Sequence, residues 1–434
     1  MRSPIKTSLA MMVCLLGAAH MVEAQATPAG TVSNPTYNPG PNLPLIDGNF
    51  QYAISAAEIL QFGYFGNSGV TPTTSLSGDV EYLSQSTVHP FSMLYAGGVL
   101  FSSIQNQRTS TFQTFTVSQG LVTRKWSMGI ADSVSYLPQS PTTGLAGVPG
   151  VGDQGLQPQP DPGVPAQSVL TNYGRRVSNS VSGNISRQLD ARTSLNGGAS
   201  YAGLYFLDGV GIETRQVTGQ LGLNRLIDAR SSVGLTAQYS TYSYSVTSFN
   251  VRGLSVSYNR QLSRELSLQG SVGPQWTSSF LSVPLTGSTE GAVAVPGRLS
   301  LSATLGLMYT KRYTSYYARY GRGVNSGSGL QAGAVADSIS AGVSRSFGRD
   351  WSASATGNYT RTSGLSDQGI TSTIYAGTQV SRRITSSLSA YASYSAQHQS
   401  LSQALTGTNA FNGLIQSVGF GITFSPRMNR LGQF

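Results

Sequence analysis

Charge is scarce in this sequence. Asp, Glu, Lys and Arg make up 10% of its 434 residues, against about 25% in soluble domains. Soluble enzymes cover their surfaces with charged side chains, so that class is disfavoured. Long apolar runs are also absent. A membrane-spanning helix needs about 20 consecutive apolar residues, which excludes a helical membrane protein.

Cysteine is almost absent as well. Residues 1–24 start with a basic stretch and continue with a short apolar core, Leu9–Ala19. Small residues follow, and cleavage is expected after Ala24 or Ala26, as in a secretory signal peptide. The only cysteine, Cys14, lies inside this segment. The mature chain is therefore expected to have no disulfide, no thiol chemistry and no cysteine-based metal site.

What is abundant is glycine, tyrosine and uncharged polar residues, with 51 Gly and 22 Tyr. Apolar and polar residues alternate with period two, as β-strands require. In 126–136, Trp126, Met128 and Ile130 alternate with small or hydroxyl-bearing residues. A soluble β-sandwich would carry Lys and Glu on its polar face. Here that face is mostly Ser, Thr, Gly, Asn and Gln, which favours a barrel with lipid outside and water inside.

A turn motif repeats along the chain, for example as Asn224-Arg225-Leu226-Ile227-Asp228-Ala229-Arg230. A repeat of this kind indicates a supersecondary unit used many times, here two strands and a short turn. Eight turns give sixteen strands, and segments 50–65 and 412–424 add one each. The motif starts at residues 84, 118, 186, 224, 259, 310, 344 and 381.

We therefore predict an all-β fold over residues 49–424. It is a transmembrane, antiparallel, up-and-down β-barrel of about 18 strands (16–18), with short periplasmic turns. An alternative makes 56–60 a short helix, because Glu58 is unfavourable on a lipid-facing strand. Asp132 also falls on the lipid-facing parity of its strand, which is costly, and we expect a β-bulge near Gly129 to turn it away.

The last predicted strand carries a family resemblance. Ser417–Phe424 reads polar, x, Gly, x, x, hydrophobic, x, aromatic, with Gly419, Ile422 and Phe424 at the key positions. This resembles the β-signal of bacterial outer-membrane proteins. The resemblance to porin-like barrels implies location in the bacterial outer membrane and contact with the barrel-assembly machinery. It also allows a homo-oligomer such as a trimer.

Three segments are expected to lie outside the barrel wall. Residues 25–48 are proline-rich and are predicted to be periplasmic. Residues 137–172 contain seven prolines and cannot be strand; they form an outer loop between strands five and six. In general porins the loop at that place folds inward and narrows the pore, but an ordinary surface loop fits equally well. Residues 425–434 are expected to be a periplasmic tail.

The charged residues suggest where the barrel meets lipid and water. Most cations lie in or beside the repeated turns, where lipid phosphates would meet them; their spread around a rim does not indicate nucleic acid. Arg175, Arg215, Arg252 and Arg361 lie near outer strand ends on the apolar parity, and we expect them to contact lipopolysaccharide phosphates. The lumen-facing candidates are Asp79, Glu81 and Arg176.

Catalytic motifs are lacking. No phosphate loop, paired carboxylates or metal-ligand cluster stands out, so we expect no catalytic residues, no metal and no cofactor. His398, close to Ser400, is the only histidine near an outer strand end. The sequence predicts a passive channel for hydrophilic solutes. The alternatives are a polysaccharide or polymer export channel, or a non-transport barrel such as an adhesin, structural anchor or outer-membrane hydrolase.

Overall fold

The structure is a computed structural model of the whole chain. It describes residues 48–431 except 64–68, 85, 103–108, 138–174, 208–211, 246, 283–292, 327–331, 367–368, 403–410 and 427–428. The predicted signal peptide, the proline-rich segment up to residue 47 and nearly all of loop 137–172 therefore lie outside the described residues. No helix in the described ranges is long and apolar enough to cross a membrane.

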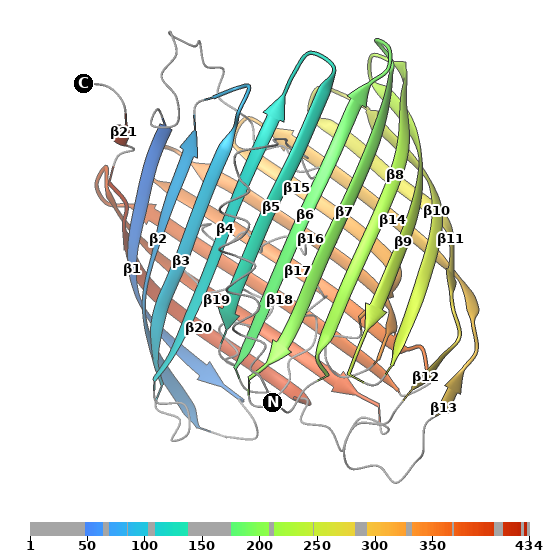
Figure 1. The fold of residues 1–434 in the computed structure, drawn as a ribbon. Coiled ribbons are helices and arrows are strands. Elements are labelled where there is room, and N and C mark those ends of the chain that lie inside the picture. The colour runs from blue at the N-terminus through green and yellow to red at the C-terminus, as the bar shows by residue number, and fades with distance from the viewer. Residues whose placement is uncertain are drawn as a thin grey trace.

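Eighteen strands form one antiparallel sheet that closes on itself (Figure 1). This confirms the predicted fold class and strand number. Each strand pairs with the next in the ring. The strands are β1 (Gly48–Phe62), β2 (Val70–Ser84), β3 (Phe91–Ser102), β4 (Thr109–Val122), β5 (Trp126–Leu137), β6 (Arg176–Gln188), β7 (Thr193–Phe206), β8 (Thr214–Asp228), β9 (Ser231–Ser243), β10 (Ser248–Gln261), β11 (Leu266–Thr277), β14 (Arg298–Lys311), β15 (Thr314–Asn325), β16 (Ala334–Phe347), β17 (Trp351–Gly364), β18 (Ile370–Arg383), β19 (Leu388–Leu401) and β20 (Gly413–Phe424).

The ring closes between the first and last of these strands. β1 and β20 pair over nine residues, from Ile54 opposite Phe424 to Phe62 opposite Gln416. The start of β1 pairs in addition with a short strand of the C-terminal tail, β21 (Asn429–Leu431). Closure leaves no sheet edge along this seam, which a barrel in lipid requires because unpaired backbone groups are costly there.

The barrel has two different ends. Short turns join the strands at one end, which we call the turn end, and longer connections join them at the other, the loop end; in Figure 1 the turn end is at the top. The eight turns coincide with the eight predicted repeats, and the strands that they join are 12 to 15 residues long. The turns lie at 85–90, 123–125, 189–192, 229–230, 262–265, 312–313, 348–350 and 384–387.

The turn after β6 explains why the motif favours an acid. The Asp190 carboxylate accepts hydrogen bonds from the backbone N–H groups of Arg192 (2.7 Å) and Thr193 (2.8 Å). These bonds satisfy donors that the tight turn leaves without a strand partner. They also stabilise the ionised carboxylate, with the bond from the Arg192 backbone contributing most, and so hold the pKa of Asp190 below its ordinary value.

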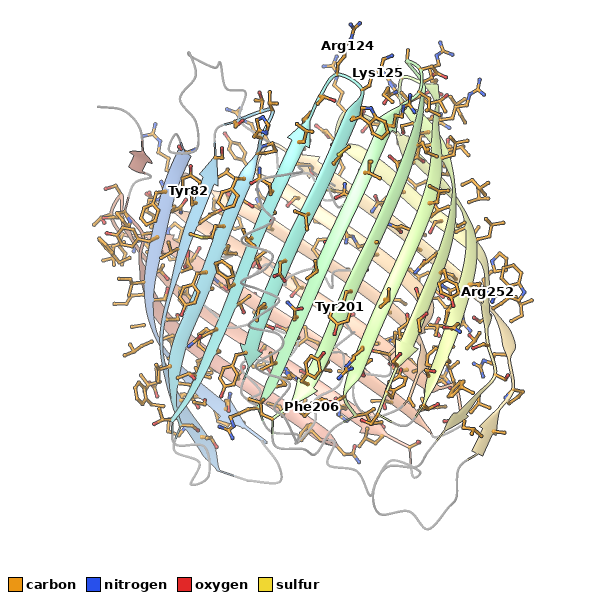
Figure 2. The ribbon with its side chains drawn as sticks, viewed as in Figure 1. Tyr82, Arg124, Lys125, Tyr201, Phe206 and Arg252 are labelled. Carbon is orange, nitrogen blue, oxygen red and sulfur yellow. The ribbon has the colours of Figure 1, made fainter. Side chains whose placement is uncertain are left out.

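Successive side chains point alternately to the two faces of the wall. Arg252 projects from the outside of the barrel (Figure 2), so alternate residues of β10 and their registered partners define the outer face. Large apolar side chains are exposed on that face, among them Leu221, Val256 and Ile339. The outer face is thus the lipid-facing one, as the period-two pattern predicts.

One alternative and one local prediction are wrong. Residues 56–60 are not a short helix, because they lie within β1, where Glu58 faces outward and its Oε2 accepts a hydrogen bond from Thr74 Oγ1 at 2.7 Å. No β-bulge turns Asp132 away, because β4 and β5 pair in one unbroken register through Gly129. Asp132 stays on the outer face, where its Oδ1 accepts a 2.8 Å hydrogen bond from Asn179 Nδ2. A side-chain partner, rather than a bulge, satisfies the carboxylate.

Candidate functional site: the barrel lumen and its openings

Hydroxyl groups face each other across neighbouring strands on the inner face. Two examples are Ser135 with Ser178 and Ser315 with Ser344, each pair 2.6 Å apart. Cross-strand hydroxyl pairs stabilise strand pairing and also make the wall polar without making it charged. The other such pairs among the described residues are Ser55–Thr423, Thr73–Ser102, Ser92–Ser118, Thr116–Ser133, Thr218–Ser240, Ser271–Thr304, Ser352–Ser381 and Ser395–Ser417.

Charged side chains are few on this face. The structure places the three lumen candidates there: Asp79 is buried, Glu81 is exposed and Arg176 on β6 is half-buried. Sequence reasoning missed two further inner-face cations, Arg298 on β14 and Arg319 on β15. These two strands lie across the ring from the acids on β2. Arg383, at the turn end of β18, has the same inward parity. The inner face of the described strands thus carries two acids and four cations, so both signs are present.

Inner-face tyrosines lie flat against glycines. A Cβ on Gly342, the register partner of Tyr317, would overlap the ring of that tyrosine. Gly421, opposite Tyr391, lies equally close to the Tyr391 ring, since an added Cβ would come within 2.5 Å of ring carbon Cζ. Each glycine leaves space for a ring to lie along the wall instead of projecting across the lumen. The lumen is therefore wider than the number of its aromatic residues suggests.

An apolar cluster occupies one side of the loop-end opening. It joins Tyr242 and Phe249, whose rings stack at 4.8 Å, to Phe280, Val335 and Leu365. Phe280 belongs to a hairpin of two short strands, β12 (Phe280–Ser282) and β13 (Val293–Val295).

Two hydrogen bonds connect this cluster to the end of β15, and a third connects Gln275 of β11 to the same segment. The Tyr242 hydroxyl donates to the Val324 carbonyl at 3.4 Å and the Tyr244 hydroxyl to the Ser326 carbonyl at 3.1 Å. The amide Oε1 of Gln275 accepts from the Val324 N–H at 3.2 Å. β9 and β15 are not neighbours in the ring, yet these hydrogen bonds join them. The wall must therefore bend inward at the loop end, and this bend narrows one side of the opening.

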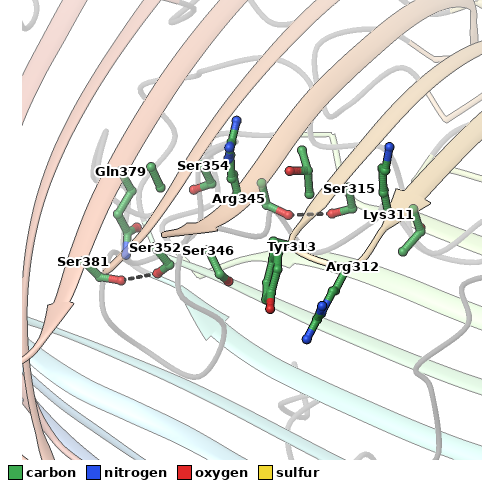
Figure 3. A pocket seen from close by; sticks show the side chains of 14 residues that line it. Lys311, Arg312, Tyr313, Ser315, Arg345, Ser346, Ser352, Ser354, Gln379 and Ser381 are labelled. Carbon is green, nitrogen blue, oxygen red and sulfur yellow. Dashed lines mark hydrogen bonds between the residues drawn. The ribbon is translucent and has the colours of Figure 1, made fainter. Parts of the chain in front are cut away.

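The turn-end opening has a hollow in its inner wall, of about 290 Å³ (Figure 3). Two of the hydroxyl pairs lie in it, Ser315–Ser344 and Ser352–Ser381, each at 2.6 Å. Gln379, Ser346 and Ser354 add to the polar lining. Three cations also line the hollow: Lys311 at the end of β14, Arg312 in the turn that follows, and Arg345 on β16. The hollow therefore combines neutral hydrogen-bonding groups with cations at its edge.

Cations surround the turn end on the lipid-facing side, as expected from the repeats. Several stack on aromatic rings: Arg187 lies 4.9 Å from the centre of the Trp126 ring and Arg382 lies 5.2 Å from that of Trp351. Figure 2 shows Arg124 and Lys125 at the tip of one turn. Aromatic rings with adjacent cations are typical of the interface between a bilayer and water.

The residues predicted to contact lipopolysaccharide phosphates lie near the loop end. The Arg215 guanidinium lies 5.8 Å from the Tyr205 ring, and that of Arg252 lies 6.0 Å from the Tyr239 ring. Arg361 is on the outer face opposite Asp337 in the β16–β17 register, and Arg175 directly precedes β6. Their contact with lipid phosphates stays a prediction.

The sequence analysis missed an ion pair beside Arg361. The Arg322 guanidinium donates from one nitrogen to both oxygens of Asp337, at 2.9 and 3.0 Å, and the Tyr320 hydroxyl donates to the same carboxylate at 3.1 Å. Arg322 and Asp337 are 15 residues apart in sequence but opposite each other in the β15–β16 register. Only that register, which was not predicted, could have revealed the pair.

Two further sets of predicted residues can be placed. Ile422 and Phe424 of the assembly signal face outward and are exposed, and Gly419 faces inward against Ser393. Their recognition by the assembly machinery stays a prediction.

His398 and Ser400 face outward from β19, with His398 level with Ile374 and Leu414. No group of three or more metal-ligating side chains occurs among the residues that the structure describes.

Comparison with known proteins gives structural likeness only. No protein-family model and no curated protein matches the chain. Acinetobacter baumannii OccAB1 has a TM-score of 0.43 and 11% identity, over 87% of this chain and 96% of that one. Pseudomonas aeruginosa OccK2 (OpdF) has 0.41 and 10%, over 87% and 97%. Pseudomonas aeruginosa OprD has 0.41 and 10%, over 87% and 95%. At these TM-scores the likeness carries no argument about function.

Proposed function

We propose that the protein is an outer-membrane channel through which hydrophilic solutes diffuse passively. The observation that supports this most directly is the contrast between the two faces of a closed 18-strand ring. Hydroxyl pairs such as Ser135–Ser178 line the inside, while apolar side chains such as Leu221 are exposed outside. A ring of this size is wide enough for a water-filled passage.

The geometry also supports a role for the loop end in limiting solute size. The apolar cluster around Phe249 occupies one side of that opening, so solutes would pass beside it rather than through the full cross-section of the barrel. The predicted inward-folding loop, 137–172, would act at the same end. Its path lies outside the described residues.

Single-channel recording in planar bilayers tests the proposal. Purified, folded protein should insert and give discrete, voltage-independent current steps. A heat-modifiable gel band and a β-type circular dichroism spectrum would establish that the barrel is folded. Folded protein that inserts into the bilayer but gives no current would contradict the channel function.

Export of a polymer remains the second candidate, because an uncharged hydroxyl-lined wall such as that at Ser395–Ser417 suits carbohydrate as well as small solutes. A hydrolase has less support. His398 lies on the lipid-facing side, and no hydrogen bond to an orienting carboxylate or amide is found for it in the part of the chain that the structure describes. Catalytic histidines depend on such a group for their orientation.

A further inference from the structure

We propose that the preferred solutes of this channel are uncharged, polyhydroxylated molecules of the carbohydrate type, and that the hollow at the turn end is a binding subsite for them. This inference rests on the proposed channel function and names its substrate class. Three features support it: the chemistry of the inner wall, the balance of its charges, and the lining of the hollow.

The first feature is the supply of hydrogen-bonding groups. A serine hydroxyl has one donor and two acceptor lone pairs. In a pair such as Ser315–Ser344 one donor is used between the two groups, so a donor and several lone pairs remain for a molecule in the lumen. Sugar hydroxyls present the same combination. The wall hydroxyls can therefore replace, one after another, the water molecules that hydrate a sugar as the sugar moves through the lumen.

The second feature is that the inner wall carries charges of both signs. Charged solutes enter a polar passage readily when its walls carry a dominant opposite charge. Here two acids, Asp79 and Glu81, are set against four cations on the inner face of the described strands, Arg176, Arg298, Arg319 and Arg383. An ion of either sign meets repulsion as well as attraction, whereas an uncharged solute is not affected by this balance.

The third feature is the hollow itself. Its volume of about 290 Å³ lies at the lower end of the range for small-molecule sites. Two hydroxyl pairs and Gln379 face into it from β15 to β18. Tyr317, two residues after Ser315 on the same face, lies flat against Gly342 beside the hollow. A flat aromatic surface next to hydroxyls suits a sugar ring, whose edge is polar and whose faces carry C–H groups.

Liposome swelling tests the substrate class with the whole protein. A neutral hexose, the corresponding hexuronate and the corresponding amino sugar have similar sizes and differ in charge. The neutral sugar should enter several-fold faster than either charged one. Equal or faster entry of a charged sugar would overturn the inference while leaving the channel intact. Failure of all three to enter, with folded protein, would instead contradict the proposed channel function.

A second experiment tests the hollow. A linear glucose oligomer added on the turn-end side should block the single-channel current. The triple variant Ser344→Ala/Ser352→Ala/Ser381→Ala should weaken that block by about fivefold or more, since one hydrogen bond contributes on the order of 1 kcal/mol. The matched control, Ser92→Ala/Ser118→Ala, removes an equally short pair (2.6 Å) on β3 and β4, and should change the block by less than about twofold.

The two variants also distinguish the hollow from a general effect of the wall. Equal weakening in both would show that the hollow is not a distinct subsite. Stronger block by inorganic phosphate than by the oligomer would show that Lys311 and Arg312 dominate the hollow, and this result would overturn the assignment to uncharged solutes. Heat-modifiable gel mobility should be unchanged in both variants, because single hydroxyls contribute little to strand pairing.

Discussion

The inner and outer faces of β8 differ although they alternate residue by residue. On the outer face Leu221 is 57% exposed, whereas Gln216 on the inner face is 6% exposed and its amide donates to Thr218. The backbone is the same on both sides, so the difference comes from what each face meets. Lipid accepts exposed apolar groups at no cost, while polar groups need partners or water.

Asp132 is the informative exception to this comparison. It lies in the middle of β5 on the outer face, where a carboxylate is costly. Its hydrogen bond from Asn179 supplies the partner that lipid cannot. The exception shows that the outer face tolerates a polar group when a neighbour on the same face satisfies it.

The largest expected effect comes from placing a charge on the outer face. Leu221→Lys should reduce the free energy of unfolding by about 2–4 kcal/mol, the cost of a lysine near the bilayer midplane. Urea titration of the protein in vesicles, followed by tryptophan fluorescence, would measure it. The control Gln220→Lys introduces the same charge one residue away on the inner face, and it should change stability by less than about 0.5 kcal/mol. Similar losses in both variants would mean that the two faces do not differ as described.

The Asp132–Asn179 pair gives the next effect. Asn179→Val removes the donor and leaves the carboxylate unsatisfied in lipid, so the free energy of unfolding should fall by about 1–3 kcal/mol. The double variant Asp132→Val/Asn179→Val should regain most of this loss, since neither polar group then remains. The same urea titration would supply all corners of a double-mutant cycle. Additive losses would show that the two side chains do not interact.

The flat tyrosine on the inner face allows a third test. Gly342→Ala adds a methyl group that overlaps the Tyr317 ring, so we expect a loss of about 1–2 kcal/mol from overpacking and a smaller single-channel conductance as the ring moves into the lumen. Gly219→Ala is the matched control on the outer face, where an added Cβ meets nothing within 4 Å. Unchanged conductance in Gly342→Ala would mean that the ring position does not limit the passage.

The smallest effect is expected at the turn end, outside the two faces. Asp190 has a lowered pKa because backbone N–H groups bind its ionised form. Its contribution to stability is therefore present above its unfolded-state pKa and is lost as the pH falls through its lower folded-state pKa. In urea titrations at pH 7 and near pH 3, Asp190→Asn should show a smaller loss on acidification than the native protein. An identical pH dependence in both proteins would show that Asp190 does not contribute to the loss of stability on acidification.

Much of the fold could be predicted because its signals are local. The alternation in 126–136 and the acid at Asp190 act within a few residues, and repeating one hairpin around a ring fixes both the fold class and the number of strands. Even the outward position of Asp132 follows from the alternation. The wrong assumption was that a β-bulge would turn Asp132 away from lipid. Instead Asn179, 47 residues away in sequence, donates a hydrogen bond to its carboxylate.

The site could be predicted only in outline. Parity placed Asp79 and Glu81 on one face, but Arg298 and Arg319 were not recognised as facing them, because nothing in the sequence says which strands lie across the ring. The apolar cluster at the loop end was also missed. Its hydrogen bond from Tyr242 to the Val324 carbonyl spans 82 residues, and no periodicity links these segments.

The sequence alone thus determined a hollow ring with a lipid-compatible outside and a hydroxyl-rich inside, since alternation and turn chemistry depend on near neighbours. Only the tertiary structure decided what limits the passage: where the wall bends at the loop end, which charges balance across the lumen, and where serines gather into a hollow. These features depend on the register and spacing of strands far apart in the chain, which the closure of the sheet brings together.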